Sequence, residues 1–393
     1  MAFVSEKVKN LPPYLFSEFQ RKKKELEAKG ADVIDLGIGA PDLPTPDFVI
    51  DKLAEESRII SNHRYSTYSG CSEFRKAVAD FYRKQYQVEL NPETEILTLI
   101  GSKEGIANLM HATINHGDSV LIPDPGYPVY RTAVHLAGGN GIPLPLDPDN
   151  GYAPLFDQVN KTAVQQAKLL LLNYPGNPTA ATAEFDTFLQ AVTFAKRNNL
   201  LVVNDAAYDM VTFEDYKSPS VLQVPGAKDY AVEFGSLSKT FNMTGWRIGY
   251  LVGNKEVVKA LATLKSNIDT SQFLPVQKAA AAALRSDFTA VAANNKVFQE
   301  RMEKMHQALN KLGIHADKPR GTIFLWARVP EGHTSMSFAN RILEDAHVIV
   351  TPGNAFGERG EGFVRIALTV PSERLDEVIS RMKRMKLKGG QTE

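Results

Sequence analysis

The chain has 393 residues, 43% of them hydrophobic, and equal numbers of basic and acidic residues, so its formal net charge is zero. A chain of this length can bury a large core, and its neutrality argues against nucleic acid or an anionic membrane as the main partner. A single cysteine, Cys71, and eight histidines without ligand spacing exclude a disulfide framework and predict no metal site.

The first 30 residues are charged and lack the apolar core of a signal peptide. No apolar run reaches the roughly 18 residues that a membrane-spanning helix needs. We therefore expect a protein of the reducing cytoplasm that does not enter a membrane. A helix is predicted within 12–29 and a short strand at 33–36. A turn at 37–42 is too rich in glycine and proline for regular structure, and helices follow at 47–57 and 73–86.

From residue 95 to residue 252, short apolar runs alternate with helical patterns. This alternation predicts right-handed crossovers and a mostly parallel sheet that is covered by helices on both faces. In such a sheet the ligand lies at the carboxyl ends of the strands. The predicted strands are 96–100, 119–122, 169–172, 200–203, 231–234 and 248–251, and the predicted helices between them are 102–115, 129–137 and 184–198.

The rest of the chain mixes strands and helices, and we predict that it forms a second, smaller α/β layer with the N-terminal segment. An alanine-rich helix at 276–284 and a long amphipathic helix at 288–312 lead into it. The elements predicted after these helices are 322–328, 335–346, 348–351, 363–367 and 372–385. The predicted division is a large domain of residues 46–283 and a small domain of residues 1–45 and 284–393.

One lysine stands where the predicted strand 231–234 ends. Desolvation there favours the neutral amine of Lys239, and a neutral amine condenses with an aldehyde to form a Schiff base. Ser236, Ser238 and Arg247 supply the hydroxyl groups and the fixed cation that a phosphate needs. These residues suggest pyridoxal phosphate, with its aldehyde on Lys239, although Ser-Leu-Ser-Lys alone is more often a surface segment.

Other strand ends carry polar or aromatic residues. Ser102 and Lys103 open a helix after strand 96–100, and helix N-termini bind phosphate well. A carboxylate at a buried strand end, such as Asp205, needs a cationic partner, and a protonated pyridine nitrogen would be one. Each of these residues, taken alone, is equally compatible with an ordinary cap or turn. The remaining candidates of this kind are Tyr127, Asn177 and Tyr208.

The pattern Ser-x-Ser-Lys, followed eight residues later by an arginine within Gly-Trp-Arg-Ile-Gly, resembles the cofactor-lysine signature of the class I/II aminotransferases. The resemblance extends from about Leu11 to Met385. It implies fold type I, an α/β fold with a mostly parallel central sheet in a large domain plus a smaller α/β domain. The Ser-Lys-Glu-Gly turn at 102–105 is more similar to the LL-diaminopimelate aminotransferase branch than to the aspartate aminotransferase branch.

The resemblance also implies roles for the cofactor-binding residues. Ser102 and Lys103 belong to the phosphate-binding turn, and Tyr127 stacks on the pyridine ring. Asp205 keeps the ring nitrogen protonated, so that the ring accepts electrons from the substrate Cα–H bond. The phenolic oxygen of the cofactor is bound by Asn177 and Tyr208.

On the substrate side, the resemblance implies that Arg365 binds the α-carboxylate, as a bidentate guanidinium does well. The backbone of Gly39 and the side chain of Asn177 lie opposite it, and Tyr14 resembles a substrate-side tyrosine of the branch. Tyr65 resembles a tyrosine that passes across a dimer interface to the phosphate of the neighbour. Two departures from the family pattern are an alanine at position 180, where glycine is usual, and the segment 270–275, which leaves the substrate open.

The activity that the resemblance implies is that of a homodimeric, pyridoxal-phosphate-dependent aminotransferase. Lys239 then acts as general base and general acid at Cα, and an amino group passes from an amino acid to a 2-oxo acid in a ping-pong reaction. LL-diaminopimelate and 2-oxoglutarate are the expected pair, but alanine, aromatic, methionine or glutamine donors stay open.

Three other classes of function remain to be weighed. A β-lyase or a decarboxylase would share the fold and the cofactor. A non-catalytic regulator usually carries a fused DNA-binding region, which we do not expect here. A nicotinamide dehydrogenase is disfavoured because no Gly-x-Gly-x-x-Gly opens a helix after the first strand.

Overall fold

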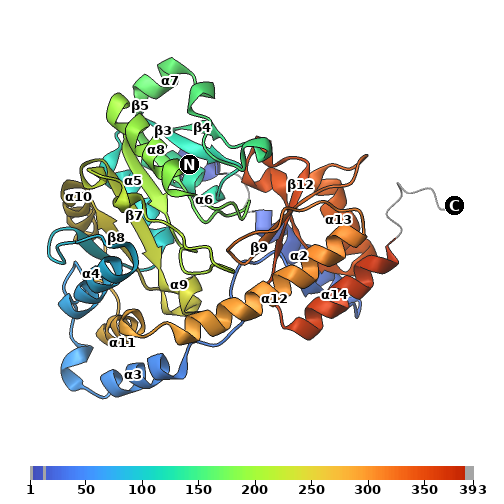
Figure 1. Cartoon of the computed structure of the whole chain (residues 1–393), viewed down its shortest axis with the longest axis horizontal. Coiled ribbons are helices and arrows are strands. Elements are labelled where there is room, and N and C mark those ends of the chain that lie inside the picture. Colours follow the sequence, from blue (N-terminus) through green and yellow to red (C-terminus); the bar gives the residue numbers. More distant parts are fainter. Residues whose placement is uncertain (1–2, 12–14, 386–393) are drawn as a thin grey trace.

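The computed structural model describes residues 3–11 and 15–385, with side chains for 3–11 and 21–385 (Figure 1). A seven-stranded sheet forms its centre, in the order β2-β8-β7-β6-β5-β3-β4. Every neighbouring pair is parallel except the two that involve β8, so the sheet is mostly parallel, as the sequence predicts. Its strands are β2 Ile96–Leu99, β3 Ser119–Asp124, β4 Asn140–Pro145, β5 Ala167–Leu172, β6 Leu201–Asp205, β7 Ala231–Ser236 and β8 Gly249–Gly253.

Helices cover both faces of this sheet because its strands are apolar on both sides. In β5, Leu170 and Leu172 belong to one hydrophobic cluster, whereas Leu169 and Leu171 belong to another. The first cluster includes α4, α8 and α11, and the second includes α5, α6 and α10. The helices around the sheet are α3 Asp47–Ser57, α4 Ser72–Tyr86, α5 Ser102–Thr113, α6 Pro128–Ala137, α7 Lys161–Gln166, α8 Phe185–Asn198, α9 Leu237–Thr240, α10 Lys255–Lys265 and α11 Leu274–Arg285.

The edge strand β4 has no counterpart among the predicted strands. Its sequence, Asn-Gly-Ile-Pro-Leu-Pro, is rich in residues that are typical of turns. Because β4 pairs only with β3, prolines can stand in it without breaking a ladder on its outer side. Proline in a run is evidence against a central strand, but it does not exclude an edge strand.

The second layer contains a three-stranded antiparallel sheet, β11-β12-β9, and a two-stranded parallel pair, β1-β10. Its helices pack on these strands around a separate hydrophobic cluster, and Figure 1 shows α12 running from beside α11 to this layer. The domain boundaries given above stay a prediction. The elements of this layer are α2 Leu15–Ala28, β1 Ile34–Asp35, α12 Thr289–Lys311, β9 Phe324–Arg328, α13 Ser335–Ala346, β10 Val348–Ile349, β11 Thr351–Pro352, β12 Phe363–Ala367 and α14 Ser372–Arg384.

Short helical turns connect the longer elements. The helix α1 Glu6–Lys9 lies against α6, where Lys7 Nζ donates to the carbonyl of Leu136 at 3.1 Å. The 3₁₀ turns are η1 Ile60–His63, η2 Pro148–Asn150, η3 Phe156–Gln158, η4 Val221–Gln223, η5 Ala227–Asp229, η6 Thr244–Trp246, η7 Gly353–Phe356 and η8 Glu358–Gly360.

A buried carboxyl group beneath the sheet provides a pH-dependent test of this packing. Asp209 accepts hydrogen bonds from the hydroxyl of Tyr86 and from the backbone N–H of Met210, each at 2.8 Å. Burial nevertheless raises the pKa of Asp209 to about 7. A carboxyl whose pKa is higher in the folded state than in the unfolded chain costs stability as the pH rises towards the folded-state value.

We therefore expect Asp209→Asn to stabilise the protein more at pH 8 than at pH 5, by about 1–3 kcal/mol. The neutral amide avoids the cost of ionising a buried acid, and this cost is larger at the higher pH. Urea denaturation at the two pH values measures the difference. Asp157→Asn, at an exposed position, is the control and should show no such dependence. An equal effect of Asp209→Asn at both pH values would contradict the prediction.

Candidate active site

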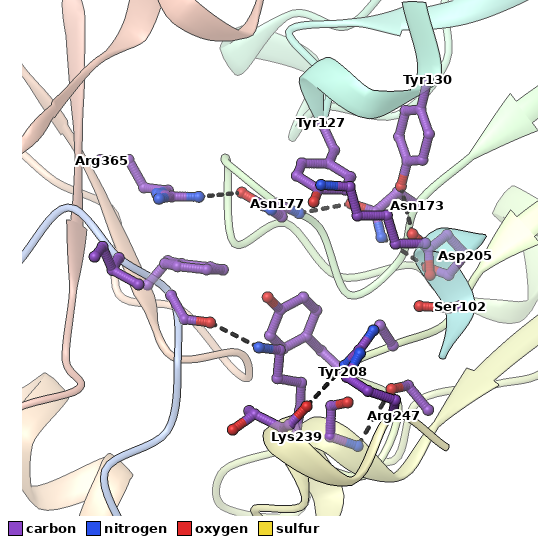
Figure 2. Close-up of a pocket in the computed structure, with 18 residues that line it drawn as sticks. Ser102, Tyr127, Tyr130, Asn173, Asn177, Asp205, Tyr208, Lys239, Arg247 and Arg365 are labelled. Atoms are coloured by element: carbon purple, nitrogen blue, oxygen red, sulfur yellow. Dashed lines mark hydrogen bonds between the residues drawn. The ribbon is translucent and has the colours of Figure 1, made fainter. Parts of the chain in front are cut away.

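A cavity of about 530 Å³ lies between the carboxyl edge of the central sheet and the strands β9 and β12 (Figure 2). The loops and strand ends of both layers contribute to it, as expected for a mostly parallel sheet. Twelve of the sequence-predicted site residues line it, namely Gly39, Ser102, Lys103, Tyr127, Asn177, Asp205, Tyr208, Ser236, Ser238, Lys239, Arg247 and Arg365.

Lys239 is placed by the short helix α9, which starts directly after β7. The hydroxyl of Ser236 accepts a hydrogen bond from the N–H of Ser238 at 3.2 Å and so fixes the start of this helix. Lys239 Nζ reaches the cavity and donates to the carbonyl oxygen of Gly39 at 2.7 Å. Burial, together with the nearby guanidinium groups of Arg365 and Arg247, lowers the pKa of Lys239 to about 8. The amine is therefore more readily neutral than an ordinary lysine.

One end of the cavity is built to hold an anion. Gly101 precedes α5 with φ of +81°, and a Cβ atom there would lie 2.3 Å from Nη2 of Arg247. Only glycine lets this guanidinium lie against the turn. Arg247 Nη1 donates to the carbonyl of Thr244 at 2.7 Å, which orients the side chain. With the N-terminus of α5 and the hydroxyl-bearing residues Ser102 and Ser238 in the same wall, this end suits a phosphate.

A buried lysine stabilises the turn at Gly101 on the side away from the cavity lining. Lys265 is fully buried and pairs with Glu104 at 2.9 Å and with Asp269 at 2.8 Å. The other carboxylate oxygen of Glu104 accepts the N–H of Ile100 at 3.0 Å, just before the turn. The ion pairs thus hold the start of α5 against the segment after α10.

The opposite wall contains a carboxylate with an unused oxygen. Asp205, the last residue of β6, is 6% exposed, and its Oδ2 accepts a hydrogen bond from the hydroxyl of Tyr130 at 2.8 Å. Its Oδ1 is buried without a hydrogen-bond partner among the described residues. Burial raises the pKa of Asp205 to about 6. A buried acceptor of this kind fits a protonated ring nitrogen, which would donate a charged hydrogen bond to it.

Arg365 comes into the cavity from β12. It is 3% exposed, and it donates to Asn177 Oδ1 at 2.7 Å and to the carbonyl of Gly37 at 2.5 Å. Its guanidinium lies 4.3 Å from the ring centroid of Phe324. A Cβ atom on Gly39 would lie 2.5 Å from this ring, so glycine leaves room for the backbone beside the arginine. The arginine is thus held rigidly where a carboxylate can approach it.

Several lining residues were not among the predicted ones. Tyr130 lies three residues after Tyr127, in the first turn of α6, and Asn173 follows β5 directly. Both come soon after the carboxyl end of a central strand, where ligands of a parallel sheet bind, so the sequence could have indicated them. Phe324 comes from the other layer, and no local pattern indicates that it lines this cavity. The other unpredicted lining residues are Ile38, Ala207 and Thr244.

Two predicted residues are not among those that the structure brings to the cavity. Tyr65 is 90% exposed and does not line the cavity. Tyr14 lies outside the described residues.

Among the described lining residues, Asp205 is the one carboxylate, against four cationic side chains, Lys103, Lys239, Arg247 and Arg365. The cavity therefore offers an anion cradle, a lysine with a lowered pKa and a carboxylate oxygen in need of a donor. These groups match the phosphate, the aldehyde and the ring nitrogen of pyridoxal phosphate. Fold and site together are those of an α/β protein whose cavity can accept an aldehyde cofactor beside a lysine.

Comparison with known proteins identifies the family. The profile of the aminotransferases of class I and II matches residues 31–382. The chain therefore belongs to this family of pyridoxal-phosphate-dependent enzymes, and the predictions of the family, of the cofactor and of aminotransferase activity are confirmed. It is 47% identical to the LL-diaminopimelate aminotransferase of Moorella thermoacetica, over 97% of this chain and 98% of that one. It is 48% identical to the enzyme of the same name from Aquifex aeolicus, over 98% and 99% of the two chains.

Solved structures agree with this assignment. Ligand-free BacF from Bacillus subtilis superposes with a TM-score of 0.96 at 38% identity, and each chain is covered completely. A probable N-succinyldiaminopimelate aminotransferase from Thermus thermophilus gives a TM-score of 0.89 at 36% identity, over 94% of this chain and 99% of that one. The predicted fold type I architecture is thereby confirmed.

Within residues 3–11 and 15–385, no group of three or more histidine, cysteine, aspartate or glutamate side chains is arranged to hold a metal ion. In the same part of the chain, no helix has the length and apolar character needed to cross a membrane.

Proposed function

We propose that this aminotransferase takes its amino group from LL-diaminopimelate and passes it to 2-oxoglutarate in a ping-pong reaction. The observation that carries this proposal is the similarity, at 47% and 48% identity over nearly the whole chain, to two enzymes named for that donor. Arg365 is the cationic lining residue that the cofactor does not use in this proposal, and it is available for the α-carboxylate that both proposed substrates carry.

The proposed roles follow from the placement of the side chains. Arg365 binds the substrate α-carboxylate and orients the Cα–H bond towards Lys239, whose amine takes the proton from Cα and later returns it. Asp205 provides the counter-charge for the ring nitrogen. When bound, the cofactor supplies the sink for the electrons of the Cα–H bond. The phosphate is assigned to Ser102, Lys103, Ser236, Ser238 and Arg247, and the cofactor ring and its phenolic oxygen to Tyr127, Asn177 and Tyr208.

A screen of amino donors tests the substrate. The purified holoenzyme is given 2-oxoglutarate and either LL-diaminopimelate, alanine, an aromatic amino acid, methionine or glutamine, and glutamate formation is measured. The proposal expects the highest kcat/KM with LL-diaminopimelate. A higher kcat/KM with another donor would refute the proposed substrate but not the aminotransferase activity. Release of ammonia and a 2-oxo acid without an acceptor would indicate a β-lyase.

We also propose a cytoplasmic homodimer in which Tyr65 completes the site of the neighbouring subunit. Tyr65 is 90% exposed, although the family resemblance assigns it to a cofactor phosphate. Ile60, Ile268 and Phe273 are also exposed, and the rings of His63 and Phe273 lie 5.3 Å apart, which brings the two segments together. An exposed apolar surface of this kind is typical of an interface.

Subunit mixing tests this arrangement. Tyr65→Ala and Lys239→Ala homodimers are both expected to be impaired, but a mixed dimer contains one site with both native residues. Random reassociation should therefore restore about a quarter of the wild-type activity, because half of the dimers are mixed and each has one complete site. The measurement is glutamate formation after joint unfolding and refolding. If Tyr65 acted in the site of its own subunit, the activity of the mixture would not exceed the combined activity of the two variants measured separately.

A further inference from the structure

We infer that Asn173 is a positioning residue that fixes the separation of the two segments carrying Asn177 and Asp205. Asn173 follows β5 directly, is 8% exposed and lines the cavity. Its side-chain amide donates to the carbonyl oxygen of Asp205 at 2.6 Å, and its Oδ1 accepts the backbone N–H of Asn177 at 2.7 Å. Figure 2 shows Asn173 between these two residues. The inference rests on the proposed roles of Asn177 and Asp205.

The strand ladder explains why a side chain is needed at this point. The parallel pairing of β5 with β6 ends at Leu172 and Asn204. Beyond it, the chain after β5 turns away into the loop that holds Asn177, so β5 can no longer bond to the carbonyl of Asp205. The side-chain amide of Asn173 donates to this carbonyl instead, and so adds one hydrogen bond between the two segments beyond the end of the ladder. Asp205 is thereby held from the β5 side as well as from β7, to which it is paired through Phe234.

The second hydrogen bond of Asn173 fixes the loop that carries Asn177. With Asn173 Oδ1 bound to the N–H of Asn177, the backbone at Asn177 stays at a fixed distance from the end of β5. The side chain of Asn177 is then available to Arg365, which donates to its Oδ1 at 2.7 Å. A single amide therefore sets the position of a residue proposed to bind the phenolic oxygen and of another proposed to bind the ring nitrogen. Small displacements of such groups reduce rates strongly.

A neighbouring asparagine provides a matched control. Asn204 is fully buried, but its amide donates to Glu233 at 2.8 Å and it does not line the cavity. Replacing either asparagine with leucine removes a buried amide of the same size. The replacement at position 204 breaks the bond to Glu233 and the bond from the N–H of Tyr174. Only the replacement at position 173 breaks the bonds to Asp205 and to Asn177 themselves. Loss of packing or of a buried hydrogen bond alone would affect the two variants alike.

The test compares Asn173→Leu, Asn204→Leu and Asp205→Asn with the wild type. The readouts are kcat, KM, the dissociation constant of pyridoxal phosphate and the pH titration of the visible absorbance of the bound cofactor. For Asn173→Leu we expect kcat to fall about 10- to 100-fold, with a smaller change in KM. We also expect a weaker affinity for the cofactor and a shifted absorbance titration. Asn204→Leu should keep the wild-type values of these quantities even if its melting temperature falls.

Three outcomes decide between the possibilities. If Asn173→Leu keeps the wild-type kcat and titration while Asp205→Asn changes both, the inference is wrong and the proposed role of Asp205 stands. If Asp205→Asn also leaves both unchanged, the proposed role of Asp205 itself fails. Should Asn173→Leu not fold, Asn173→Asp keeps the acceptor for Asn177 N–H and loses the donor to Asp205. It must then lower kcat at least about tenfold for the inference to hold.

Discussion

Replacing Lys239 with alanine should abolish transamination, with kcat falling by about 10⁴-fold or more. The amine is proposed both to hold the cofactor and to move the proton at Cα, so its removal takes away two functions at once. The lowered pKa of Lys239, about 8, and its hydrogen bond to the Gly39 carbonyl fit an amine that can lose its proton inside the cavity. The measurements are glutamate formation and the visible absorbance of the lysine-bound cofactor, and both should be lost.

A lysine outside the cavity provides the control for this variant. Lys217 is exposed, and Lys217→Ala should keep the wild-type rate and absorbance. If Lys239→Ala kept either its rate or its absorbance, the assignment of this lysine would be wrong.

Replacing Asp205 with asparagine should lower kcat about 10²- to 10³-fold, as the loss of one preorganised electrostatic group commonly does. The amide cannot supply the negative charge that keeps a ring nitrogen protonated. Asp209→Asn is the matched control, because Asp209 is also a buried acid four residues along the chain but does not line the cavity. It should keep kcat near the wild-type value.

The pH dependence of cofactor binding tests the same carboxyl group independently. The pKa of Asp205 is raised to about 6 by burial, so lowering the pH through that value protonates it and removes the charge that would face the ring nitrogen. We therefore expect the affinity of the wild type for pyridoxal phosphate to fall as the pH drops below about 6. Asp205→Asn should lose that part of the pH dependence. An identical pH profile for the two proteins would contradict the role given to Asp205.

Much of the central sheet could be predicted from the sequence because buried parallel strands are continuous apolar runs. Leu169 to Leu172 is such a run, and both of its faces are buried. The ends of these runs also located Asp205, Asn177 and Lys239, since polar residues that follow a buried strand meet at one edge of the sheet. The edge strand β4 was not predicted, because it is not an apolar run. Its prolines and glycine are tolerated where one side of the strand is unpaired.

Contacts between the two layers could not be predicted from local sequence patterns. Nothing near Phe324 indicates that its ring packs against Arg365 and limits position 39 to glycine, because that depends on how β9 meets the turn after β1. Arg365 itself was assigned by family resemblance, not by its strand pattern. At Ala180, where the family usually has glycine, φ is +56°, so the alanine keeps a backbone conformation that glycine adopts more easily.

The most direct test of the account is to locate the bond to the cofactor. The holoenzyme is reduced with sodium borohydride, digested and examined by mass spectrometry, which identifies the lysine that carries the reduced pyridoxyl group. The account predicts a single modified peptide with the group on Lys239. Modification of a different lysine, with Lys239 unmodified, would contradict it.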